Sequence, residues 1–236
     1  MMNLFYLLAF YVSTLIVAFF MFKIQKRCSF FEDRIYLHQF SPLIVFFLFV
    51  ISGISSINIV NVNINAPVIK NSLTGSSLVL LTFAISFLFI KLFHKHKDNI
   101  DIKGSGVICT GMLIGAFTEE TGWRVYLPFL LKDIIHWELA YLLIGLLIGL
   151  WHYWHFKYGI VFMIFFVLLN MAFSYIAGSL TIATGNNLII PSLMHFVLGM
   201  CFFVFFRYTW SKISVIGTLS FILALVAIFL KFAIVN

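Results

Sequence analysis

Long uninterrupted runs of apolar residues constrain the fold of this 236-residue chain more than any other feature. A helix needs about 20 predominantly apolar residues to cross a bilayer, and several runs reach that length. The chain is 63% hydrophobic and only 10% charged, whereas a soluble domain carries about 25% charged residues. We therefore predict an all-α fold, a polytopic bundle of transmembrane helices that fills the chain.

About eight runs have the length that a bilayer demands. They lie at approximately 3–22, 36–57, 76–93, 105–131, 136–156, 158–178, 187–206 and 214–234. The fourth run is too long for one perpendicular helix, so we expect it to tilt strongly or to break near Pro128. The asparagine-rich stretch 58–77 is predicted to be a surface loop. These limits suggest three N-terminal helices over 1–103, a membrane core over 104–206 and a C-terminal helix over 207–236.

The basic residues predict how the chain is oriented. If the N-terminus lies outside, eleven of the 15 lysines and arginines fall on the cytoplasmic side, three fall outside, and Arg124 lies within a span. This excess of positive charge in cytoplasmic loops is the usual signal of orientation, and contact with anionic membrane lipids explains it better than a nucleic-acid partner does. The abundance of Phe, Ile, Lys and Asn is typical of AT-rich bacterial genomes, so we predict a multi-pass protein of a bacterial plasma membrane.

Three ionisable residues interrupt the apolar segment 104–131: Glu119, Glu120 and Arg124. A charged side chain at membrane depth costs several kcal/mol, which makes such a group a functional-site hypothesis. In a helix, Glu120 and Arg124 are four residues apart and meet on one face. Glu119 points about 100° away and is left to act as a general base. The alternative is a structural ion-pair cluster that locks two helices together.

Histidines in two later apolar segments extend the candidate site. His152 shares a helix face with His155, three residues further on, and His195 opens the run that follows Pro191. Neutral imidazole can bind a metal or polarise a carbonyl group. The structural alternatives are an interfacial belt of aromatic residues for His152 and His155, and an interhelical hydrogen bond for His195.

At these residues the chain resembles the CPBP family of intramembrane proteases, also called Abi. That family includes the CAAX prenyl endopeptidases and proteins of bacteriocin processing or immunity. The pattern Glu119-Glu120 followed by Trp123-Arg124 is similar to the first motif of the family. The resemblance covers roughly residues 104 to 204.

The two histidine motifs of the family match less closely. The second motif is an aromatic residue, three residues and a histidine. His152 fits this motif if Ile148 takes the aromatic position. His155 also fits, with Trp151 as the aromatic residue. The sequence that precedes His152 favours His152 as the motif histidine. The third motif is a histidine followed four residues later by Asn or a similar polar residue. His195 fits the first position of this motif, but the fourth residue after it is Gly199. Asn170 or Asn187 could substitute for the missing polar residue.

The resemblance implies hydrolysis of a peptide bond within or at the membrane. Glu119 would activate water, and His152 and His195 would orient the water, bind a metal or stabilise the oxyanion. Glu120 and Arg124 would support the site. Two mechanisms would use the same residues. Glu119, His152 and His195 could hold a zinc ion, or they could act without a metal. The expected substrate is a membrane-associated or lipidated peptide or protein, with a bacteriocin leader or signalling peptide favoured over a prenylated one.

Two other functions use the same residues. A non-catalytic member of the family could act as a bacteriocin-immunity or cell-envelope scaffold, and the departures at Ile148 and Gly199 favour this hypothesis. A proton-coupled transporter would also place acids and histidines inside the membrane. Against a transporter, the sequence shows no repeated half and no matched pair of broken spans.

Overall fold

The computed structural model describes residues 2–27, 36–93, 105–208 and 212–235, and within these ranges the regular secondary structure is helical. Four helices are long and apolar enough to cross a membrane: α1 (Met2–Arg27), α3 (Ala66–Phe93), α7 (Ile160–Ile182) and α9 (Lys212–Val235). The stretches 28–35 and 94–104, which carry part of the predicted charge asymmetry, lie outside the described residues. The all-α bundle of a multi-pass membrane protein is confirmed, and the count of eight spans stays a prediction.

The remaining elements are shorter. The α-helices are α2 (Ser41–Ile51), α4 (Ser105–Glu120), α5 (Leu127–Leu131), α6 (Trp137–Trp151) and α8 (Ile189–Tyr208). The 3₁₀-helices are η1 (Leu37–Phe40), η2 (Ile57–Ile59) and η4 (Tyr153–Tyr158), and η3 (Thr121–Tyr126) is a π-helix.

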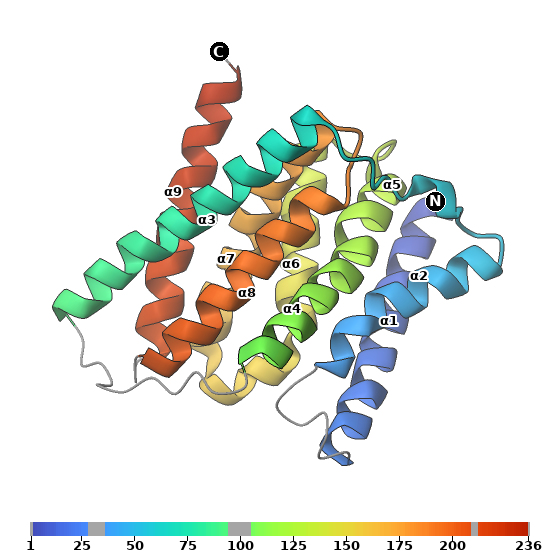
Figure 1. Ribbon diagram of the computed structural model, residues 1–236. Coiled ribbons are helices and arrows are strands. Elements are labelled where there is room, and N and C mark those ends of the chain that lie inside the picture. Colours follow the sequence, from blue (N-terminus) through green and yellow to red (C-terminus); the bar gives the residue numbers. More distant parts are fainter. Residues whose placement is uncertain (1, 28–35, 94–104, 209–211, 236) are drawn as a thin grey trace.

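Two apolar cores divide the bundle. Figure 1 shows α4 and α8 side by side through its middle, with α1 and α2 on one side and α3 and α9 on the other. One core is built from α3, α7, α8 and α9. The other is built from α1, α2, η3, α5 and α6. The contact between α4 and α8 therefore lies where the two halves of the bundle meet.

The long fourth segment continues through a change of helix type instead of breaking. Helix α4 passes directly into the π-helix η3, and α5 then continues to Leu131. Pro128 has no N–H, and in an α-helix its ring would clash with the carbonyl group of Arg124, four residues earlier. A wider π turn relieves that clash, and such turns are frequent at functional sites. The expected irregularity is therefore present one turn before Pro128, at the residues that follow the two glutamates.

The predicted loop over 58–77 is wrong in its second half, because α3 already begins at Ala66. Asn65 caps this helix, since its side-chain oxygen accepts a hydrogen bond of 3.0 Å from the backbone N–H of Val68. Pro67 stands in the first turn, where a missing N–H costs no helical hydrogen bond. Gly75, which suggests a loop when the sequence is considered alone, lies inside the helix against the side chain of Met194.

Helices α6 and α7 approach closely because glycine faces backbone at their contact. A Cβ atom on Gly145 would lie 2.5 Å from the carbonyl oxygen of Asn170 and 2.5 Å from the Cα atom of Met171. Neither of these backbone atoms can move without displacing α7. This contact sets the distance between α6, which His152 caps, and α7, which carries Ser174.

We expect Gly145→Ala to lower the free energy of unfolding by about 1–3 kcal/mol, because overpacking a close backbone contact costs energy of that order. The melting temperature of the purified protein in detergent would measure the loss. Gly217→Ala is the matched control, since a Cβ atom there would have its nearest neighbours at 3.6 Å, in the Phe165 ring. Equal melting temperatures for the two variants would contradict the proposed role of Gly145.

Candidate active site

A buried ion pair forms the centre of the candidate site. The Nη1 atom of Arg124 donates a hydrogen bond to Oε1 of Glu120, as the four-residue spacing predicts. The Nη2 atom of Arg124 donates to the hydroxyl of Ser174 at 2.9 Å. The guanidinium group also lies 4.7 Å from the centre of the Phe173 ring. Arg124 therefore joins the α4–η3 segment to α7, across the boundary between the two halves of the bundle.

His195 on α8 lies between the two glutamates. Its Nδ1 atom is 2.7 Å from Oε1 of Glu120, and its Nε2 atom is 3.9 Å from Oε2 of Glu119. A carboxylate only accepts hydrogen bonds, so Nδ1 carries the proton in this contact and Nε2 is directed at Glu119. A carboxylate that fixes the orientation of a histidine in this way is common at sites where the other ring nitrogen is functional.

Glu119 is buried, with 1% of its surface exposed. Neither of its carboxylate oxygens has a hydrogen-bond partner within the described parts of the chain. A buried polar group without a partner costs free energy, so its retention calls for an explanation such as a catalytic role. Glu119 and Glu120 thus have the separate environments predicted from the helical period: Oε1 of Glu120 contacts Arg124 and His195, whereas neither oxygen of Glu119 has a hydrogen-bond partner within the described residues.

His152 stands at the edge of this cluster. It caps α6, where its Nδ1 atom lies 2.8 Å from the carbonyl oxygen of Ile148. Its ring stacks on that of His155, with centres 5.6 Å apart. The structure therefore brings Glu119, Glu120, Arg124 and His195 into direct contact, whereas within the described residues His152 makes no hydrogen bond or ion pair with them.

The predicted zinc ligands fit a metal only in part. No three His, Cys, Asp or Glu side chains in the described ranges are grouped closely enough to hold one metal ion. Glu119 and His195 face each other and could supply two ligands. Catalytic zinc sites use three protein ligands.

The two asparagines that could replace the missing family residue are engaged elsewhere. Asn187 donates at 2.8 Å to the carbonyl group of Asn63 and caps α8 through the N–H of Ile189. Asn170 donates at 2.8 Å to the carbonyl group of Phe166 in its own helix. A Cβ atom on Gly199 would make an ordinary van der Waals contact with the sulfur atom of Met112, at 3.8 Å.

Three residues of this region were missed by reasoning from the sequence: Ser174, Phe173 and Gln39. Ser174 and Phe173 contact Arg124 from α7. The side chain of Gln39 lies near the Glu119 carboxylate. The sequence gives little indication of Ser174, because a serine in an apolar helix is common. The one feature that could have indicated Gln39 is its position, as an amide directly before the apolar run 40–51.

The fold and the cluster together define a membrane-embedded helix bundle with acidic, basic and histidine side chains buried between its halves. Residues 105–201 match the Rce1-like family, described as type II CAAX prenyl endopeptidase Rce1-like. For this segment, the match confirms the resemblance inferred from the motifs, and it supports a CAAX-type intramembrane protease in general terms. The matched segment contains the whole ion cluster, whereas Gln39 lies outside it. No curated protein matches the chain.

Proposed function

We propose that this protein is an intramembrane endopeptidase that hydrolyses a peptide bond of a membrane-associated or lipidated peptide or protein. The observation that carries the proposal is the buried Glu119 carboxylate, whose oxygens have no hydrogen-bond partner in the described structure and which faces Nε2 of His195. The match of residues 105–201 to the Rce1-like family supports the same reaction class. We place the protein in the plasma membrane of a bacterium.

In the proposed reaction, Glu119 accepts a proton from a water molecule. The water oxygen forms a bond to the carbonyl carbon of the substrate, and Glu119 then gives the proton to the leaving amine as the C–N bond breaks. Negative charge develops on the carbonyl oxygen during the attack. His195 stabilises that charge from Nε2 when its ring is protonated. A preorganised donor in a water-poor site is especially effective at this step.

Glu120 and Arg124 position His195 instead of reacting. The Glu120 carboxylate holds Nδ1 of His195 at 2.7 Å, which leaves Nε2 directed at Glu119. Arg124 neutralises Glu120 and is itself held by Ser174. Since a buried charge is tolerated only when it is paired, this chain of contacts allows an oriented histidine to exist inside the membrane.

The direct test is cleavage by the purified protein in liposomes. Internally quenched peptides of two kinds would be supplied: peptides ending in a prenylated CAAX sequence, and unmodified hydrophobic leader peptides. Mass spectrometry would identify the cleaved bond. Cleavage that depends on Glu119 supports the proposal. If no peptide is cleaved, and a Glu119→Gln variant still supports growth of the native cell, the protein acts as a non-catalytic scaffold.

We expect His195→Ala to reduce cleavage far more than His152→Ala. His195 faces Glu119 directly, whereas Nδ1 of His152 is held by the backbone of its own helix and its ring stacks on His155. Initial rates in liposomes at equal protein content would measure both losses. Similar losses for the two variants would show that His152 moves into the site when substrate binds, and the assignment of His195 as the principal histidine would then be wrong.

A further inference from the structure

Gln39 lies beside the candidate base although it is distant in sequence. It belongs to η1, which is fastened to α4 because the hydroxyl of Thr118 donates to the carbonyl oxygen of Gln39 at 3.0 Å. The side-chain amide of Gln39 lies directly on Gly115, where a Cβ atom would overlap its Oε1 atom. Gly115 is one helical turn before Glu119. The bare backbone at Gly115 therefore admits the amide to the face of α4 that carries the base.

The Gln39 amide is close enough to the Glu119 carboxylate to interact with it. The contact has no regular hydrogen-bond geometry, since both Glu119 oxygens lack such a partner in the described structure. Glu119 is almost fully buried, whereas Gln39 is half-buried. Gln39 is thus a half-buried polar group next to the buried base.

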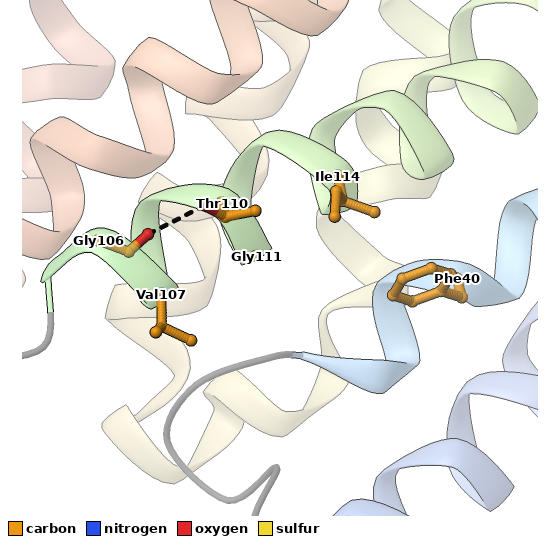
Figure 2. Close-up of a pocket in the computed structure, with 6 residues that line it drawn as sticks. All are labelled: Phe40, Gly106, Val107, Thr110, Gly111 and Ile114. Atoms are coloured by element: carbon orange, nitrogen blue, oxygen red, sulfur yellow. Dashed lines mark hydrogen bonds between the residues drawn. The ribbon is translucent and has the colours of Figure 1, made fainter.

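A pocket of about 290 Å³ lies between η1 and the first part of α4, lined by Phe40, the residue after Gln39, and by Gly111, one helical turn before Gly115. Figure 2 shows Phe40, the residue after Gln39, facing Ile114 of α4 across the opening, with Gly111 on the helix wall. Gly111, Gly115 and Glu119 are successive members of a four-residue series, so they share one face of α4. The pocket, the Gln39 amide and the Glu119 carboxylate therefore follow one another along that face.

We propose that the Gln39 amide binds the substrate by donating a hydrogen bond from Nε2 to the carbonyl oxygen of the peptide bond that is cleaved. This inference rests on the proposed peptidase function. An apolar substrate side chain in the pocket would bring its peptide bond to Gln39 and Glu119 together. The amide hydrogen bond strengthens as the carbonyl oxygen gains negative charge, so Gln39 stabilises the transition state more than the bound substrate.

The test compares Gln39→Ala, Gln39→Asn and Gln39→Glu in the liposome assay, with the cleaved peptide as substrate. We expect Gln39→Ala to lower kcat by about 10²–10³-fold with little change in KM, as for loss of one donor to an oxyanion. Gln39→Asn keeps the amide and should recover part of the loss. An ionised Gln39→Glu side chain cannot donate and should recover none of it.

Gln25→Ala is the matched structural control. Gln25 is a buried glutamine on α1, and its side-chain oxygen accepts a hydrogen bond of 3.0 Å from the backbone N–H of Leu37, at the start of η1. Its loss should loosen η1 and lower the melting temperature without a selective loss of kcat. An equal loss of kcat in Gln25→Ala, or a Gln39→Ala variant that changes only KM, would overturn the assignment of Gln39.

The same experiment separates this inference from the function on which it rests. If Glu119→Gln abolishes cleavage while Gln39→Ala retains the kcat of wild type, only the role of Gln39 is wrong. If wild type cleaves no peptide, or if cleavage is the same in Glu119→Gln, both proposals fall.

Discussion

Peptide cleavage should fall by about 10²–10⁴-fold when Glu119 is replaced by Gln, which is the usual contribution of a positioned general base. The substitution keeps the size and polarity of the side chain but removes its ability to accept a proton. Because neither carboxylate oxygen holds a structural hydrogen bond in the described structure, the change should leave the fold intact. Initial rates in liposomes, together with the melting temperature in detergent, would measure the two effects separately.

Glu138→Gln provides the control for a glutamate that lies outside the site. Glu138 stands in the first turn of α6, where it accepts a hydrogen bond of 3.1 Å from the hydroxyl of Tyr175 and one of 3.4 Å from Lys231. This variant should cleave at the rate of wild type. A Glu119→Gln variant that is folded and cleaves at the wild-type rate would rule out Glu119 as the base.

The second large effect concerns stability. We expect Arg124→Met to lower the free energy of unfolding by about 3–5 kcal/mol, because it leaves the Glu120 carboxylate buried without its cation. Glu120 is 0% exposed and Arg124 is 2% exposed, so water cannot replace the lost partner. The loss should appear as a lower melting temperature and as faster proteolysis of the protein in detergent.

The double variant Glu120→Gln/Arg124→Met tests whether charge is the cause. Once both charges are removed, the uncompensated carboxylate is gone, so part of the stability should return. Arg124→Lys should be intermediate, since an ammonium group is a single point charge and cannot contact Glu120 and Ser174 with the geometry of the planar guanidinium group. If the double variant recovers no stability relative to Arg124→Met, the contribution of Arg124 comes from its contacts with Ser174 and Phe173 instead of from neutralising Glu120.

The chemistry of the site explains why these two experiments should have different outcomes. Neither carboxylate oxygen of Glu119 has a hydrogen-bond partner in the described residues, so its loss should affect activity more than folding. Arg124 makes contacts to two helices, so its loss should affect folding first. If both variants lost activity and stability together, the cluster would act mainly as an ion pair that locks the helices.

Much of the architecture could be predicted from the sequence, because the bilayer imposes a length on every spanning helix. The predicted span at 158–178 identified a membrane helix without knowledge of its neighbours, and the structure has this helix at Ile160–Ile182. The pairing of Glu120 with Arg124 was also predictable, since residues four apart on a helix meet whatever surrounds them. The start of α3 was missed because Pro67 and Gly75 suggest a loop when their neighbours in the structure are unknown.

The sequence alone therefore determined an all-helical membrane protein, the ion pair within α4 and η3, and a set of candidate histidines. Only the tertiary structure decided which histidine meets the acids, and it brought Ser174 and Gln39 to the same place. The physical reason is that helical periodicity fixes neighbours within one turn, whereas contacts between helices depend on how closely their backbones pack. Here the backbone of α4 can lie close to η1 because Gly115 has no side chain and leaves room for Gln39. The contact between α4 and α8 brings His195 to the two glutamates.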